Sequence, residues 1–360
     1  MRTNPQPHPG IGRTAANASP TGMVSDHFNA GTSKKNPFDL LDGSGRILSV
    51  PPGRPTSLRF LAWIGWAVLI TFIATEGRAQ ELEPRAYANT PVGLNFLIVG
   101  DSYLTGSVLT DPSLPLKDAE LRAQMPLIAY ARSLDWWGKS GKFNAVLPYA
   151  CASGSAEFNG EKVTRDVCGW ADPRVKLSVN LYGAPALSLK EFPGYKQDLI
   201  VGAGLQIGLP LGQYDDDKLL NIGTHRWSIK PEVGLSKAIG TLTLELILGA
   251  TFYTDNNSFL GDKQRKQDPL YSLQGHLIHG FRSGIWLALD ATTYRGGRTT
   301  IDGVRSDDSQ RNTRLGATLS LPVNRHNSIK LNASSGVMTR SGGDFKLIGA
   351  VWQYRWGGGL

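Results

Sequence analysis

Most of the chain, from about residue 91 onward, consists of short segments in which apolar and polar residues alternate. In RVKLSVNLY (174–182), the odd positions hold Val and Leu, and the even positions from 174 to 180 hold Arg, Lys, Ser and Asn. Successive side chains of a strand point to opposite faces, so this pattern predicts a β-strand with one apolar and one polar face. Strands of this kind can cross a lipid bilayer only when they close into a barrel, with the apolar face toward lipid.

Twelve such segments can be placed along the chain. The predicted strands lie near 91–103, 120–133, 141–152, 170–182, 198–210, 226–238, 241–253, 269–281, 284–294, 313–321, 328–338 and 345–356. Bacterial barrels have an even number of strands. The sequence therefore predicts an all-β fold over residues 80–360, a transmembrane antiparallel β-barrel of about twelve strands. A β-sandwich is the alternative, but it does not favour ten-residue strands.

The connections between these segments alternate in length. The longer polar ones lie near 104–119, 154–169, 211–225, 255–268 and 296–309. Outer-membrane barrels have short periplasmic turns and longer external loops. We therefore expect these five to be external, with both ends of the barrel in the periplasm. The segment 184–197 is an exception, because it is long on the predicted periplasmic side.

The N-terminal part of the chain has a different composition. Residues 1–56 are rich in Pro, Gly, Ser and Asn, which predicts a disordered extension or a misassigned start. Residues 57–79 have the pattern of a signal peptide, with Arg59 before the apolar stretch 60–73 and a small residue at Ala79, after which we expect cleavage. The apolar stretch is shorter than the roughly 20 residues of a spanning helix. A retained inner-membrane anchor is the alternative.

The net charge of the chain is +8, but residues 80–360 contribute only half of it. This balance gives little reason to expect nucleic acid as a partner. The two cysteines, Cys151 and Cys168, lie in the predicted exported part, where disulfides form. We expect them to form a disulfide that closes an external loop; two unpaired thiols are the alternative.

Several segments resemble a known family. They include PVGLNFLIVG, DPRVKLSVNLYGAPAL, WSIKPEVGLSK and GAVWQYRWGG, and together the similar segments span about 87–358. The chain resembles the outer-membrane proteins associated with the meta-cleavage pathway of phenol degradation. The resemblance implies a barrel that admits aromatic or other small hydrophobic molecules, with no catalytic or binding residues to transfer. The two cysteines are not part of the family's pattern.

Motifs that carry enzyme chemistry are absent from the sequence. It has no Gly-x-Ser-x-Gly elbow, His-Glu-x-x-His site or phosphate-binding loop, so we expect no enzyme, no cofactor and no metal. An outer-membrane hydrolase is the least favoured alternative. The acidic run 215–217 has carboxylates suited to calcium, but it lacks a clear ligand spacing, so a solvated loop tip is favoured.

The period-two pattern also predicts which charged residues line the lumen. The candidates are Arg132, Lys142, Arg174, Lys176, Lys230, Glu232, Glu245, His276, Asp290, Arg314, Lys330 and Arg355, with Arg122 placed inward by the same pattern. Buried charges must be paired or hydrated. We favour a paired, hydrogen-bonded network that fills the narrow barrel over a basic pathway for anions.

Together these observations predict a passive outer-membrane channel for small aromatic or hydrophobic compounds. A structural or surface barrel with a plugged lumen is the alternative. The expected partners are outer-membrane lipid, the barrel-assembly machinery and the small aromatic or hydrophobic solute. If the pathway is basic, the solute is expected to be anionic.

Overall fold

The computed structural model describes residues 83–109, 116–158 and 161–360, which belong to one compact unit. The predicted N-terminal extension (1–56) and signal peptide (57–79) lie outside the described residues. The strands are β1 (Leu94–Leu109), β2 (Leu116–Gln124), β3 (Leu127–Trp136), β4 (Lys139–Phe158), β5 (Glu161–Trp170), β6 (Arg174–Tyr182), β7 (Leu199–Gly208), β8 (Ser228–Ile239), β9 (Leu242–Tyr253), β10 (Asn256–Phe259), β11 (Lys263–Gln267), β12 (Leu270–Gly280), β13 (Trp286–Gly296), β14 (Thr299–Ile301), β15 (Val304–Arg305), β16 (Gln310–Pro322), β17 (Asn327–Thr339) and β18 (Gly342–Gly357), with one 3-10 turn, η1 (Phe192–Gly194).

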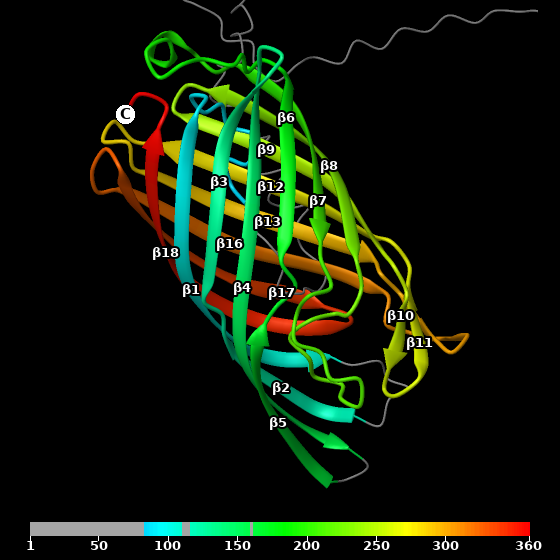
Figure 1. Cartoon of the computed structure of the whole chain (residues 1–360). Coiled ribbons are helices and arrows are strands. Elements are labelled where there is room, and N and C mark those ends of the chain that lie inside the picture. Colours follow the sequence, from blue (N-terminus) through cyan, green and yellow to red (C-terminus); the bar gives the residue numbers. More distant parts are fainter. Residues whose placement is uncertain (1–82, 110–115, 159–160) are drawn as a thin grey trace, which may run out of the picture. The chain divides into compact units, whose positions relative to one another are not determined.

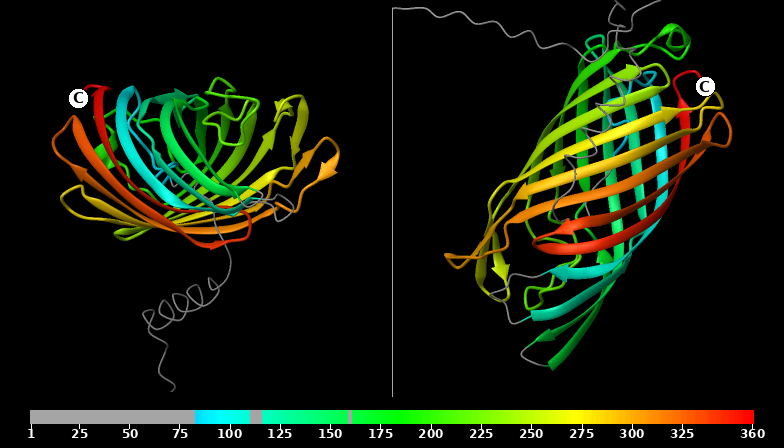
Figure 2. Two further views of the ribbon diagram at one scale, coloured as in Figure 1. Left: turned by 90° about the horizontal axis from the view of Figure 1, so that it is seen from below. Right: turned by 180° about the vertical axis from the view of Figure 1, so that it is seen from behind.

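The strands close into a tilted barrel because β1 pairs with β18 along its whole length (Figures 1 and 2). Two positions in the wall hold two strands each. β2 and β3 both lie between β1 and β4, and β5 and β6 both pair with β4. Their breaks contain Pro126 and Pro173, which lack the N–H that a ladder needs. The described strands therefore form a twelve-stranded antiparallel barrel, which confirms the predicted fold class.

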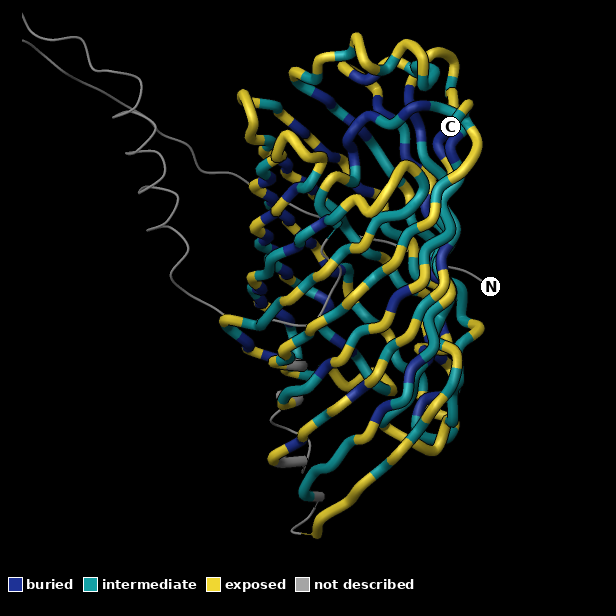
Figure 3. The backbone as a smooth tube through the Cα atoms, turned by 90° about the vertical axis from the view of Figure 1, so that its left-hand side faces the viewer, coloured by how far each residue is buried: buried dark blue, intermediate teal, exposed yellow. Residues whose placement is uncertain are grey.

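Exposed residues alternate with buried ones along several strands, most clearly along β8, β9, β12 and β13 (Figure 3). In β8 and β9, Val233 and Leu246 are exposed, whereas Glu232 and Glu245 are almost fully buried. The exposed apolar side chains form the outer face, and the polar side chains form the inner face. Among the described residues, no helix is long and apolar enough to cross a membrane.

The two ends of the barrel differ. One end, which we call the periplasmic end after the orientation expected from the loop lengths, has short turns, the connection with η1, the start of β1 and the end of β18. At the other end, which we call the external end, β2, β4 and β5 continue past the rest of the wall (Figure 1). The prediction of loops at 104–119 and 154–169 is therefore wrong in large part. The predicted loops 255–268 and 296–309 contain β10, β11, β14 and β15, which form a small separate sheet. Outside the bilayer a strand needs no apolar face, so these strands lack the pattern by which the others were found.

Candidate functional site in the barrel lumen

Strand register decides which charged residues face the lumen, because directly opposite residues share a face. Eleven of the twelve predicted lumen residues lie on the inner face or its rim: Lys142, Arg174, Lys176, Lys230, Glu232, Glu245, His276, Asp290, Arg314, Lys330 and Arg355. Arg132 is the exception. It is exposed and lies opposite Phe143 and Asn95 on the outer face. Arg122, exposed and opposite Ser153, also points outward.

In β2 and β3 the even-numbered residues point outward, which is the reverse of the prediction, and this reversal has a physical reason. Their inner face is apolar rather than polar, with Ala123 and Ala129 buried. Ala123 belongs to a cluster inside the barrel that also contains Leu104 and Ala152. An apolar face was expected to contact lipid, but here it packs against other apolar residues in the lumen. Arg132 is left near the barrel's periplasmic edge, where a long cationic side chain can reach water.

A stretch of chain that precedes the first strand lies inside the barrel. We call residues 83–93 the lumen segment. The Tyr87 side chain is 1% exposed, and its hydroxyl donates to Glu232 Oε1 at 2.9 Å. The Arg85 backbone N–H donates to Glu245 Oε2 at 2.7 Å. Lys142 Nζ donates to the carbonyl oxygen of Ala86 at 3.0 Å. The inner wall therefore holds this segment from three different strands.

The other end of the lumen segment is fixed to the periplasmic edge of the barrel. Ser133 Oγ donates to the Pro91 carbonyl at 2.5 Å and accepts from the Leu94 N–H at 2.9 Å. The Val92 N–H donates to the carbonyl of Leu187, in the long periplasmic connection, at 2.9 Å. These contacts join the segment to the first strand and place it in the periplasmic half of the lumen.

Two glycines make room for the Tyr87 ring. Gly202 of β7 and Gly234 of β8 lie directly opposite each other on the inner face. A Cβ added at either position would lie 2.2 Å from a carbon of the Tyr87 ring. Any side chain here would therefore displace the ring, so the two glycines form its slot.

Glu232 is the centre of the charge network in the lumen. Its carboxylate lies 2.8 Å from Lys176 Nζ and 3.3 Å from Lys230 Nζ, and its side chain is 1% exposed. Lys176 Nζ also lies 2.7 Å from Glu83 Oε2 of the lumen segment. Such buried charges are tolerated because each has opposite charges and hydrogen bonds nearby. The network neutralises two of the lysines that a basic pathway for anions would need.

A histidine and a carboxylate form a second buried group. His276 Nδ1 lies 2.7 Å from Asp290 Oδ1, and Thr318 Oγ1 donates to Asp290 Oδ2 at 2.9 Å. The His276 Nε2 atom has no hydrogen-bond partner among the described residues. A His–Asp pair can activate a nucleophile only when a hydroxyl or thiol contacts the second ring nitrogen. The described residues place no such group there, so we interpret the pair as a structural link between β12, β13 and β16.

The remaining cations also have defined surroundings. Arg314 donates to Ser334 Oγ at 3.0 Å and to the Phe345 carbonyl at 3.1 Å. Lys330 Nζ lies 5.9 Å from the centre of the Trp286 ring, which also lies 5.6 Å from the Arg85 guanidinium carbon. A cavity of about 100 Å³ lies beside this ring, between the lumen segment and the wall, and its lining includes Arg85 and Glu245.

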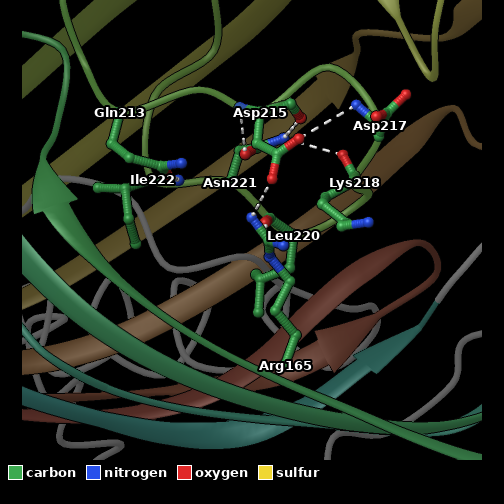
Figure 4. A network of polar contacts seen from close by, with 8 residues as sticks. All are labelled: Arg165, Gln213, Asp215, Asp217, Lys218, Leu220, Asn221 and Ile222. Atoms are coloured by element: carbon green, nitrogen blue, oxygen red, sulfur yellow. Dashed lines mark hydrogen bonds and ion pairs between the residues drawn. The ribbon is translucent and has the colours of Figure 1, made fainter.

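At the external end, the connection between β7 and β8 packs against the inner wall, where Ile222 contacts the cluster around Leu104. Arg165 on β5 lies 3.2 Å from Asp215 and donates to the Leu220 carbonyl at 2.9 Å (Figure 4). Asn221 donates to the Asp215 carbonyl at 2.8 Å. Asp215 therefore fastens the loop, with its side chain still 37% exposed, while Asp216 and Asp217 are exposed, as expected of a loop tip. The Asp215–Asp217 carboxylates lie within 4.8 Å of one another, but an acidic group of this kind is common without an ion.

A buried arginine borders the mouth at this end. The Arg226 guanidinium donates to Gln267 and stacks on the Tyr253 ring, with 4.4 Å between the guanidinium carbon and the ring centre. Burial, and secondarily the neighbouring charge of Arg265, lowers the pKa of Arg226 to about 10. Arg226 therefore remains charged near neutral pH and adds a fixed cation to the external mouth.

Cys151 and Cys168 lie directly opposite each other on β4 and β5, and a disulfide joins them. The bond lies just external to the break between β5 and β6. It therefore fastens the extended hairpin to the wall where the ladder is interrupted.

We expect replacement of both cysteines by serine to loosen this hairpin without dismantling the barrel. A disulfide that closes a loop of this size contributes about 3 kcal/mol by restricting the unfolded chain. Proteolysis between Cys151 and Cys168 should become faster, while heat-modifiable gel migration of the barrel is retained. Mass mapping of protein from an oxidising periplasm supplies the control. Two alkylatable thiols in the wild type would contradict the bond.

Reasoning from the sequence did not find the lumen segment, because residues 83–93 have no period-two pattern. One signal was present. The inner face of β7 holds glycine at 202, 204 and 208, where other strands place polar side chains. Such a row of glycines on one face indicates that something packs closely against it.

A solved outer membrane channel has the same architecture. The crystal structure of an outer membrane channel from Pseudomonas putida F1 superposes with a TM-score of 0.66 at 21% identity, covering 77% of this chain and all of that one. The transport unit of the autotransporter AIDA-I from Escherichia coli gives a TM-score of 0.47 at 10% identity, covering 80% and 97%. A comparison with curated protein sequences gave no match.

The family model described as "Putative MetA-pathway of phenol degradation" matches residues 107–353. Because this match spans well over half of the chain, the protein belongs to that family of β-barrel proteins.

Proposed function

We propose that the protein is a passive channel of the outer membrane for small aromatic or otherwise hydrophobic molecules. Its export would use the predicted signal peptide, and its insertion would use the barrel-assembly machinery. The outward apolar band supports the membrane location, and the family match supports a role connected with aromatic compounds. The likeness of the barrel to the outer membrane channel from Pseudomonas putida supports the same proposal.

The proposal rests on the way in which the lumen segment closes the lumen. In the part of the chain that the structure describes, the lumen segment has no covalent tie to the barrel wall other than its own continuation into β1, and it is held by hydrogen bonds and ion pairs. Such contacts can be exchanged for water, whereas a core of interlocked side chains cannot. On the external side, the inner wall carries the apolar cluster around Leu104, Ala123 and Ala152, with Met125 and Phe345 packed against it. Ile222 of the connection between β7 and β8 packs on this cluster, so a hydrophobic solute would reach the apolar surface when that connection moves aside.

The charge network favours neutral solutes over anions. Lys176 and Lys230 lie beside two carboxylates, Glu232 and Glu83, so this network adds little net positive charge to the lumen. The second candidate function is a structural barrel that stays closed, which the same contacts of the lumen segment would favour if they never exchange. We infer that the protein is not an enzyme, because the His276–Asp290 pair has no nucleophile in contact among the described residues.

Uptake by whole cells tests the proposal. The probes are a neutral naphthylamine dye, which becomes fluorescent when it passes the outer membrane, and its sulfonated, anionic counterpart. Cells that produce the barrel should take up the neutral dye faster than cells without it, and the anionic dye should gain little. Lys230→Gln and Arg314→Gln should leave neutral uptake largely unchanged. A fall in anion uptake in these variants would favour the basic pathway instead. No uptake of either dye through a folded barrel would favour the closed structural barrel.

A further inference from the structure

The outer face of β13 and β16 ends, at the external side, in two arginines that lie directly opposite each other. Arg295 pairs with Arg311 in the strand register, and both side chains are exposed. Their chain neighbours Tyr294 and Asn312 are buried on the inner face, which fixes the arginines on the outer face. Directly opposite residues have Cβ atoms about 5 Å apart. Both guanidinium groups can therefore reach the same small group.

The position of the pair relative to the membrane follows from the pairs below it. Moving from the periplasmic side, the outward pairs of β13 and β16 are Leu287–Leu319, Leu289–Ala317, Ala291–Leu315, Thr293–Thr313 and Arg295–Arg311. The two threonine hydroxyls are 3.4 Å apart. The column therefore changes from apolar to hydroxyl to cationic. Tyr271, opposite Arg295 on β12, is 56% exposed, as expected of an aromatic side chain at the membrane interface.

The pair differs from the other arginines nearby. Arg298 and Arg340 both contact Asp307, and Arg305 lies 2.9 Å from Asp268. In the described ranges, by contrast, neither Arg295 nor Arg311 forms an ion pair. Like charges directly opposite each other on a sheet destabilise it. An anion between the two groups would remove this repulsion.

We propose that Arg295 and Arg311 bind a phosphate group of a glycolipid in the outer leaflet, of the lipid A type. Guanidinium groups match phosphate oxygens in a forked, charge-assisted geometry. Along the strands, the arginine pair lies one outward pair beyond the threonines and two beyond the last apolar pair. This is the depth at which the head group of a lipid lies. The acyl chains of the same molecule would cover Leu289 and Leu315, which are 57% and 45% exposed. Free phosphate has the same head-group chemistry but cannot make the apolar contact.

The test compares Arg295→Gln/Arg311→Gln with a charge-matched control, Arg282→Gln/Arg325→Gln, in which two exposed arginines of the periplasmic turns are changed. Each purified full-length barrel, shown to be folded by heat-modifiable migration, is titrated in neutral detergent with lipid A, dephosphorylated lipid A, phosphatidylglycerol and inorganic phosphate. Binding is followed by native mass spectrometry. Loss of the two charge-assisted contacts should weaken lipid A binding at least about tenfold. The control should bind like the wild type.

The other titrations distinguish a phosphate carried by a lipid from free phosphate. Dephosphorylated lipid A should bind the wild type as weakly as lipid A binds the double variant. Inorganic phosphate should not compete at concentrations comparable to those of lipid A. Equal lipid A affinity of wild type and folded double variant would overturn the proposal, as would competition by inorganic phosphate at the same concentration. In detergent without lipid A, the double variant should be at least as heat-stable as the wild type, because the repulsion is gone. Marked destabilisation would show that the arginines serve the fold instead.

Discussion

Leu246→Arg is expected to destabilise the membrane-inserted barrel by about 2–4 kcal/mol. Leu246 lies on the outer face near the middle of β9 and is 42% exposed, so an arginine there would face the centre of the lipid layer. The cost arises because the charged group must either lose its hydration or draw water and head groups into the membrane. Folding into liposomes, titrated with urea and followed by heat-modifiable migration, measures this cost.

Leu242→Arg is the matched control, because it places the same charge on the same face and the same strand. Leu242 is the first residue of β9, at the periplasmic edge, and is 39% exposed. Near the interface the cost of arginine falls to about 0–1 kcal/mol. Equal destabilisation by the two substitutions would contradict the depth assigned to β9. Equal tolerance of both would contradict a lipid-facing outer wall.

The sequence predicts the barrel well because lipid imposes a strict rule on one face of each strand. In β8, β9, β12 and β13, exposed and mostly apolar residues alternate with buried residues, many of them polar, so the period of two is unambiguous. The rule fails at β2 and β3, where the lumen is itself apolar. Both faces then carry apolar residues, and the sequence pattern cannot distinguish inside from outside. The pattern therefore predicts a lumen position for Arg132, although this residue lies on the outer face.

The candidate site was only partly accessible to sequence reasoning. Period two places Lys176, Lys230 and Glu232 on the inner face, but it cannot show that one carboxylate holds both lysines. The contact of Lys176 with Glu232 depends on the register between β6 and β8 across β7. The lumen segment was inaccessible for a different reason. Its contacts are long-range hydrogen bonds between irregular backbone and the wall, such as that from Arg85 to Glu245, and such contacts leave no local pattern.

Gly234→Val is expected to expel the lumen segment and raise the ion conductance of the barrel several-fold. A Cβ at position 234 would lie 2.2 Å from the Tyr87 ring, and the wall around it is backbone of β7 and β8 that cannot yield. Valine suits a strand, so the ladder itself should form. The ring would have to leave its slot, and its hydrogen bond to Glu232 would be lost with it. Conductance of single barrels in planar bilayers measures the opening.

Two further variants separate displacement of the segment from damage to the wall. Tyr87→Ala removes the ring without adding bulk and should raise conductance in the same direction, because the ring fills the slot between Gly202 and Gly234. Gly275→Val adds the same side chain as Gly234→Val, but on the outer face, where its Cβ would meet only Leu246 at 3.6 Å, and conductance should stay at the wild-type level. If folded Gly234→Val and Tyr87→Ala both conduct like the wild type, the lumen segment does not limit passage. The constriction would then have to lie in the charge network of the wall, whose carboxylate Glu232 remains between Lys176 and Lys230 after the segment has left.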